Sequence, residues 1–286
     1  MAIYHLSIKI ISRGKGKSAV AAAAYRSGTI IKNNYDGLTH DYTKKGGVVH
    51  TEILLPDNAP SEYTDRAVLW NAVEKIENAR NSQLAREIEI ALPAELTLMQ
   101  NKSLVREYVK RNFVEHGMCA DVCIHDTDNG NPHAHIMLTM RPIEQGGSWS
   151  AKSKKEYVLD MDGEKIRLAS GEYKSRKISV VDWNDQTKAE EWREAWATAA
   201  NRYLEKLGHS ERIDHRSFVV CYKGRFGLNA TTHMHTSLFA VHSEDCCERR
   251  EVEIIFNRQG LGGFHALLLY FRFELDGEIV QLKMVI

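Results

Sequence analysis

The chain has 286 residues, of which 43% are hydrophobic and 27% charged, a composition typical of a soluble globular protein. No stretch approaches the roughly 18 consecutive apolar residues of a membrane span, and the first ten residues lack the apolar segment of a signal peptide. The five cysteines are odd in number and show no spacing typical of a disulfide framework. We therefore expect a cytoplasmic protein that is not inserted in a membrane.

Basic residues are concentrated at the start of the chain. The whole sequence has 38 Lys or Arg and 38 Asp or Glu, so its formal net charge of zero gives no overall attraction to nucleic acid. Residues 1–50, however, contain eight Lys or Arg and only two Asp. The acidic residues follow in segments that have the pattern of surface helices, so the basic charge can still gather on one face.

The hydrophobic pattern alternates between strands and helices. Residues 3–10 alternate apolar and polar side chains, which indicates a half-buried strand. Residues 18–28, SAVAAAAYRSG, predict a short helix of very small side chains that ends at Gly28. Further strands are expected at residues 48–55 and 84–92, and helices at 61–80, 96–116 and 183–208. This order, with a pair of strands before the last helix, predicts an α+β fold with a central antiparallel β-sheet covered by helices on one face.

Three histidines lie close together in the segment CIHDTDNGNPHAHIMLTMRP, residues 123–142. His133 and His135 are two positions apart, so on a strand both side chains point to one face. His125 ends the preceding apolar stretch, and the sequence between the histidines, DTDNGNP, is rich in turn formers. A hairpin would therefore place His125 beside His133 and His135.

This histidine triad has the composition of a metal site. Three imidazole ligands that leave coordination positions open describe a catalytic site better than a closed structural one. We expect a divalent metal ion, Mg²⁺ or Mn²⁺, at the triad; the alternative is a set of solvent-facing hairpin histidines. A second His-x-His pair, His233 and His235, has no obvious third partner and is interpreted as structural or incidental.

Tyr25 ends the alanine-rich segment and is followed by Arg26. A phenol attacks phosphorus only if its proton is drawn away and the charge that develops is stabilised, which a metal at the triad would favour. Considered alone, Tyr25 has the position of an ordinary packing residue. Its neighbours Arg13, Lys15, Lys17 and Arg26 are expected to hold the DNA backbone, although a basic loop of this kind can also serve only solubility.

Three more residues are candidates for the same site. Glu87 and Glu89 point to one side of their predicted strand, so one of them could hold a histidine tautomer as a hydrogen-bond acceptor; the alternative is a solvated strand face. Arg141 shares the histidine face of its strand and is a candidate phosphate contact. The sequence Gly16-Lys17-Ser18 predicts no P-loop, because Ile11 stands where that motif requires glycine.

Four segments of the chain, taken in order, resemble the MobA/MobL-type conjugative relaxases, which are HUH endonucleases. These segments are AIYHLSIKIISRGKGKSAVAAAAYRSG, REIEIALPAEL, HDTDNGNPHAHIM and GHSERIDHRS. The resemblance covers about residues 2–218. It implies that Tyr25 becomes joined to a 5′ phosphate and leaves a free 3′ hydroxyl, while the histidine triad holds the metal. It also implies single-stranded DNA at a plasmid transfer origin as the substrate, with accessory transfer proteins and a secretion-system coupling protein as partners.

The resemblance predicts a relaxase domain at residues 1–218. Within it, the charged and turn-rich composition of about residues 146–177 predicts a peripheral insertion with a hairpin and a mobile loop. From Phe218 onward we recognise no continuation, so residues 219–286 are expected to be a divergent tail whose apolar run forms strands. Two other functions stay open. One is a metal-dependent phosphodiesterase that uses water, in which Tyr25 is structural, and the other is an origin-binding module without nuclease activity.

Overall fold

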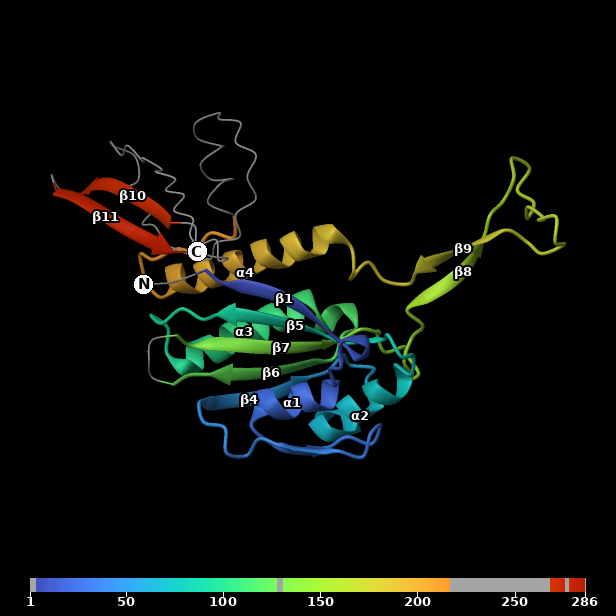
Figure 1. The fold of residues 1–286 in the computed structure, drawn as a ribbon, viewed down its shortest axis with the longest axis horizontal. Coiled ribbons are helices and arrows are strands. Elements are labelled where there is room, and N and C mark those ends of the chain that lie inside the picture. The colour runs from blue at the N-terminus through green and yellow to red at the C-terminus, as the bar shows by residue number, and fades with distance from the viewer. Residues whose placement is uncertain (1–3, 128–130, 217–267, 276–277, 286) are drawn as a thin grey trace, which may run out of the picture. The chain divides into compact units, whose positions relative to one another are not determined.

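The computed structural model describes residues 4–127, 131–216, 268–275 and 278–285. Its centre is a five-stranded antiparallel sheet with the strand order β1-β5-β7-β6-β4 (Figure 1). The strands of this sheet are β1 (Leu6–Ser12), β4 (Val48–Leu54), β5 (Gln83–Ala91), β6 (Ala120–His125) and β7 (His133–Thr139). The predicted α+β fold with a central antiparallel sheet is confirmed.

One face of the sheet packs against α3 (Leu98–Asn112) and α4 (Gln186–Lys206). Thr97 begins α3 with a capping box, in which its side chain accepts from the Gln100 amide and the Gln100 side chain accepts from the Thr97 amide. The apolar sides of the helices and strands then form one buried core, which includes Leu104, Trp196, Ile88 and Ile136. These are the two longest predicted helices, and both are confirmed to within a few residues.

The other face of the sheet is divided between an apolar half and a polar half. The apolar half, with Ala85 and Met137, packs against α1 (Ala19–Ser27) and α2 (Arg66–Ile76). The polar half carries the histidine triad at the opposite end of the same strands. Helices therefore cover both faces, and the expectation of helices on one face was wrong. The reason is that α1 and α2 each have an apolar side that must be buried, and the apolar half of the second face provides the surface for it.

Two further hairpins accompany the sheet. The short strands β2 (Ile30–Lys32) and β3 (Thr39–Asp41) follow α1 and were not predicted. The strands β8 (Ser153–Tyr157) and β9 (Ser175–Ser179) form an arm that extends away from the sheet (Figure 1). This arm contains the hairpin expected in the charged insertion. Between its two strands, isolated bridges pair Leu159 with Lys165 and Arg167 with Tyr173.

The chain divides into two compact units, residues 1–240 and 241–286. The described part of the second unit is an antiparallel hairpin of β10 (Leu268–Leu275) and β11 (Glu278–Val285), so its apolar run contains a strand as expected. The pair His233 and His235 lies outside the described residues. Among the helices that are described, none has the length and apolar character needed to cross a bilayer.

Candidate active site

The hairpin of β6 and β7 brings the three histidines together, as the sequence predicted. His125 pairs directly with His133, and His135 pairs with Cys123 one step further along the same face. The three ring centroids lie 4.8 to 5.3 Å apart. One nitrogen from each ring lies within 4.8 Å of the corresponding nitrogens of the other two, so the cluster could hold a metal ion.

Each histidine also has an oxygen partner, which determines its tautomer. His125 Nε2 donates to the carbonyl oxygen of Arg26 at 2.6 Å, and His133 Nδ1 donates to that of Asn131 at 3.0 Å. His135 Nδ1 donates to Oε1 of Glu87 at 3.0 Å. A carbonyl or carboxylate oxygen can only accept, so these nitrogens carry the protons. The remaining nitrogens, Nδ1 of His125 and Nε2 of the other two, keep the lone pairs that a metal requires.

The electrostatics of the site favour a neutral His125 and an ionised Glu87. Burial lowers the pKa of His125 to about 4, and this effect outweighs the hydrogen bond to the Arg26 carbonyl, which raises it. Burial alone would raise the pKa of Glu87, but hydrogen bonds from His135 and Arg26, together with the charge of Arg26, lower it to about 2. At neutral pH, His125 is therefore free of the proton that would compete with a metal.

The two candidate glutamates have different partners. Glu87 is 4% exposed and its Oε1 atom accepts hydrogen bonds from both His135 and Nε of Arg26. Glu89 instead forms an ion pair with Lys9 across the β1–β5 pair, with 2.8 Å between Nζ and Oε2. Glu87 is thus the residue that holds a triad imidazole, and its pairing also fixes Arg26 beside the triad.

Tyr25 lies in the last turn of α1, with half of its side chain exposed. The helix is held at both ends: the Ser18 hydroxyl accepts from the Ala21 amide, and Gly28 adopts a left-handed conformation with φ of 65° while its amide donates to the Ala24 carbonyl. The carbonyl group that follows Tyr25 along the chain, that of Arg26, accepts the hydrogen bond from His125. The helix end that carries Tyr25 is therefore attached directly to the triad.

Lys45 and Tyr42 also contact Tyr25, and sequence analysis did not single out either residue. Lys45 Nζ lies 3.9 Å from the centre of the Tyr25 ring and donates to the Tyr25 carbonyl oxygen at 3.0 Å. The rings of Tyr25 and Tyr42 meet edge to face, with centroids 5.2 Å apart. The sequence signal was a Lys-Lys-Gly-Gly loop that directly precedes a strand, but nothing local connects such a loop with residue 25.

Two arginines expected to contact DNA are engaged with buried acids at the other end of the sheet. Arg13 binds the Glu74 carboxylate at 2.6 Å, and it also donates to the Glu77 carbonyl. Arg141 binds Glu77 at 2.7 Å. Both glutamates are at most 4% exposed. The structure therefore gives these two arginines roles within the fold and does not bring them to the triad.

The two lysines of the predicted basic loop are exposed at the start of α1. Tyr25 lies seven positions after the Ser18 cap, a rise of about 10 Å along the helix at 1.5 Å per residue. Lys15 and Lys17 therefore lie at the opposite end of this helix from Tyr25, whereas Arg26 belongs to the site. Their contact with DNA stays a prediction.

A buried cluster lies on β6 below the triad. Asp121 and His125 share a strand face, and the Asp121 carboxylate accepts two hydrogen bonds from Arg66, each of 2.8 Å. It also accepts one from the Trp70 indole at 2.9 Å. Because Asp121 is 2% exposed, this ionic contact joins α2 to the triad strand in an environment with little water.

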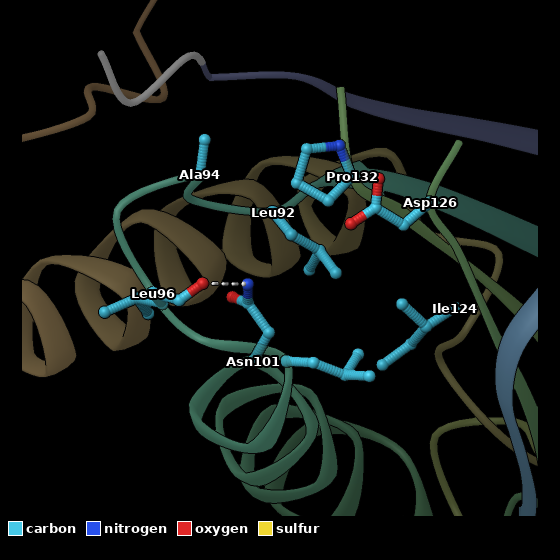
Figure 2. A pocket seen from close by; sticks show the side chains of 8 residues that line it. Leu92, Ala94, Leu96, Asn101, Ile124, Asp126 and Pro132 are labelled. Carbon is cyan, nitrogen blue, oxygen red and sulfur yellow. Dashed lines mark hydrogen bonds between the residues drawn. The ribbon is translucent and has the colours of Figure 1, made fainter. Parts of the chain in front are cut away.

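A pocket lies near the same hairpin (Figure 2), and its residue Ile124 places it on the face of the sheet opposite to the triad. Ile124 and Pro132 directly precede His125 and His133, and Ile124 belongs to the core under α3. Asn101 of α3 donates to the Leu96 carbonyl at 3.2 Å across this region. The lining residues are Leu92, Ala94, Leu96, Leu98, Asn101, Ile124, Asp126 and Pro132. None of the three histidines lines this pocket, so it is separate from the triad.

Known proteins are similar to this chain in both sequence and fold. The chain is 38% identical to the mobilization protein MobL of Acidithiobacillus ferridurans over 242 residues, and 37% identical to the conjugal transfer protein TraA of Rhizobium radiobacter over 264 residues. These alignments cover 76% and 88% of this chain but 58% and 23% of those relatives, so the chain spans less than two thirds of either.

A structure solved in a study of the molecular basis of vancomycin resistance transfer in Staphylococcus aureus aligns with a TM-score of 0.65 and 34% identity, over 76% of this chain and all of that one. The profile of the MobA/MobL family matches residues 17–241, which continues past Ser217, where we expected the resemblance to stop. This match covers more than half of the sequence. The chain belongs to the MobA/MobL family.

Proposed function

We propose that this chain is a relaxase, an enzyme that nicks and rejoins one DNA strand at a plasmid transfer origin. The observation that carries the proposal is the attachment of the Tyr25 helix to the histidine triad through the hydrogen bond from His125 to the Arg26 carbonyl. Tyr25 is half exposed and directly precedes Arg26, the residue joined to the cluster of three imidazoles, which supports its role as the nucleophile. Family membership supports the same activity.

The residues present fit a divalent metal ion, for which we propose Mg²⁺ or Mn²⁺. His125, His133 and His135 would hold it, because each has one nitrogen committed to an oxygen acceptor and one nitrogen left for the ion. When bound, the ion would polarise the scissile phosphate and offset the charge that develops on it. Glu87 would orient His135, and its ion pair with Arg26 would keep that orientation fixed.

In the proposed reaction, the Tyr25 hydroxyl oxygen attacks phosphorus as its proton is lost. The bond between phosphorus and the 3′ oxygen breaks, the 3′ oxygen gains a proton, and Tyr25 becomes joined to the 5′ phosphate. Reversal of these steps by a 3′ hydroxyl rejoins the strand. Half exposure of Tyr25 is what this chemistry requires, because the nucleophile must be open to a strand that enters from solvent.

The sequence placed the end of the nuclease domain at residue 218, but the family match continues to residue 241, so we propose that the divergent tail begins only after that match. We further propose that the enzyme acts in the cytoplasm on single-stranded DNA. Accessory transfer proteins and a secretion-system coupling protein would be its partners. The names of the relatives, mobilization and conjugal transfer proteins, support this assignment.

A suicide oligonucleotide with a transfer-origin sequence tests the proposal. With a divalent metal present, we expect the protein to form a covalent adduct that denaturing electrophoresis detects. Tyr25→Phe should abolish the adduct but keep most of the DNA affinity, since it removes one hydroxyl and leaves the ring and the basic surface in place. Cleavage without an adduct would indicate a phosphodiesterase that uses water, and binding without cleavage would indicate an origin-binding module.

A further inference from the structure

The loop of residues 42–47 contacts Tyr25 on two of its groups. The Lys45 ammonium lies over the phenol ring, 3.9 Å from its centre, and donates to the main-chain oxygen of the same residue at 3.0 Å. The Tyr42 ring packs edge to face against the Tyr25 ring. An exposed tyrosine ordinarily samples several rotamers, and contacts on its ring and its backbone restrict that freedom.

The same loop is anchored to the triad hairpin. The Asp126 amide donates to the Gly47 carbonyl at 2.8 Å, and the next residue, Val48, pairs with His125. Gly47 has φ of 81°, and a Cβ atom there would lie 2.7 Å from Cγ2 of Thr127. Only glycine allows this close approach without strain. The loop thus spans from the metal-binding hairpin to the side chain of the nucleophile.

We propose that Lys45 is a positioning residue for Tyr25, an inference that rests on the relaxase function proposed above. Its cation fixes the position of the ring and favours the negative charge that spreads into the ring as the phenolic proton is lost. The two contacts with Tyr25 distinguish Lys45 from a lysine that neutralises a DNA phosphate. Burial and the nearby charge of Arg26 lower the pKa of Lys45, which agrees with its half-buried place between the helix and the loop.

Three variants of the full chain test this role: Lys45→Met, Lys45→Arg and, as a matched control, Lys44→Met. Lys44 is the adjacent residue of the loop and is exposed. Single-turnover formation of the covalent adduct on the suicide oligonucleotide measures the chemical step. Fluorescence anisotropy over a range of salt concentrations measures DNA binding, and thermal unfolding shows that each variant is folded.

We expect Lys45→Met to slow adduct formation at least about tenfold, the scale of one lost interaction with a developing charge. DNA affinity and its salt dependence should be unchanged. Lys45→Arg should recover most of the rate, because a guanidinium also packs on an aromatic face. Lys44→Met should keep the rate within about twofold, because it leaves the contacts of Tyr25 intact.

Two results would overturn the inference while leaving the relaxase function standing. One is a Lys45→Met variant that forms the adduct at the wild-type rate. The other is a rate loss accompanied by weaker binding and a shallower salt dependence, which would assign Lys45 to the DNA backbone. By contrast, a wild-type protein that forms no adduct would refute the proposed function itself.

Discussion

Glu87 and His135 are diagonal neighbours on β5 and β7, and Nδ1 of His135 lies 3.0 Å from Oε1 of Glu87. The same oxygen accepts from Nε of Arg26, the residue that follows Tyr25. One buried carboxylate therefore connects the strand that carries two histidines to the helix that carries the proposed nucleophile. A substitution at Glu87 should therefore affect both the histidine strand and the helix that carries Tyr25.

Glu87→Gln should lower the affinity of the triad for Mn²⁺ about 10- to 100-fold, the usual effect of removing an outer-shell partner of a metal-binding histidine. The neutral amide removes the charge that fixes the protonated Nδ1 of His135. Isothermal titration calorimetry measures the affinity. Glu89→Gln should have a smaller effect, since Glu89 binds Lys9 instead. Equal losses in the two variants would contradict the separate roles of the two glutamates.

His133→Ala and His135→Ala should each reduce Mn²⁺ affinity and cleavage but leave the protein folded. Neither side chain is fully buried, and neither belongs to the apolar cores. We expect melting temperatures within a few degrees of wild type, because changes below about 1 kcal/mol shift them by only that much. Calorimetric titration and thermal unfolding give the two measurements. Cleavage by wild-type protein that survives a chelator would argue against the metal.

Lys15→Ala combined with Lys17→Ala should flatten the salt dependence of DNA binding. On a single strand, each phosphate contact contributes roughly 0.7 to the slope of log affinity against log salt concentration. We therefore expect the slope of the double variant to decrease by the contribution of one or two contacts. Sequence preference should not change, because phosphate contacts position the DNA while base contacts specify it. Identical slopes, measured by fluorescence anisotropy, would assign these lysines to solvent.

Arg13→Ala should act on stability instead. It leaves the Glu74 carboxylate, which is 2% exposed, without its guanidinium partner. Breaking a buried ion pair on one side costs about 3–5 kcal/mol, and we expect a loss near the lower value because the Glu74 carboxylate also accepts from the Ala19 amide. Urea unfolding measures the change. A variant as stable as wild type would return Arg13 to the list of candidate DNA contacts.

Asp121→Ala should lower the free energy of unfolding by about 3 kcal/mol, the lower end of the range for a broken buried pair, because it leaves the partly buried guanidinium of Arg66, 14% exposed, uncompensated. The double variant Arg66→Met with Asp121→Leu should recover part of this loss, since it removes both charges together. Urea unfolding of Arg66→Met, of Asp121→Leu and of the double variant gives the comparison. If the double variant loses as much as the sum of the two singles, the pair has no coupling.

The sequence alone determined the features that depend on neighbouring residues. The two-residue spacing of His133 and His135, the turn formers before them and the apolar strand that ends at His125 predicted the hairpin and its triad. Gly28 predicted the end of the helix that carries Tyr25. These features follow from backbone periodicity and turn chemistry, which act over a few residues.

Only the tertiary structure decided how these elements work together. It placed β5 between β1 and β7, and in this strand order Glu87 binds His135 while Glu89 binds Lys9. It held Arg13 on a glutamate 61 positions away, and it placed Lys45 over the ring of Tyr25. Such contacts depend on strand order and on ion pairs between distant segments. The sequence shows which residues are charged. Which of several oppositely charged residues each one pairs with is determined only when the chain packs.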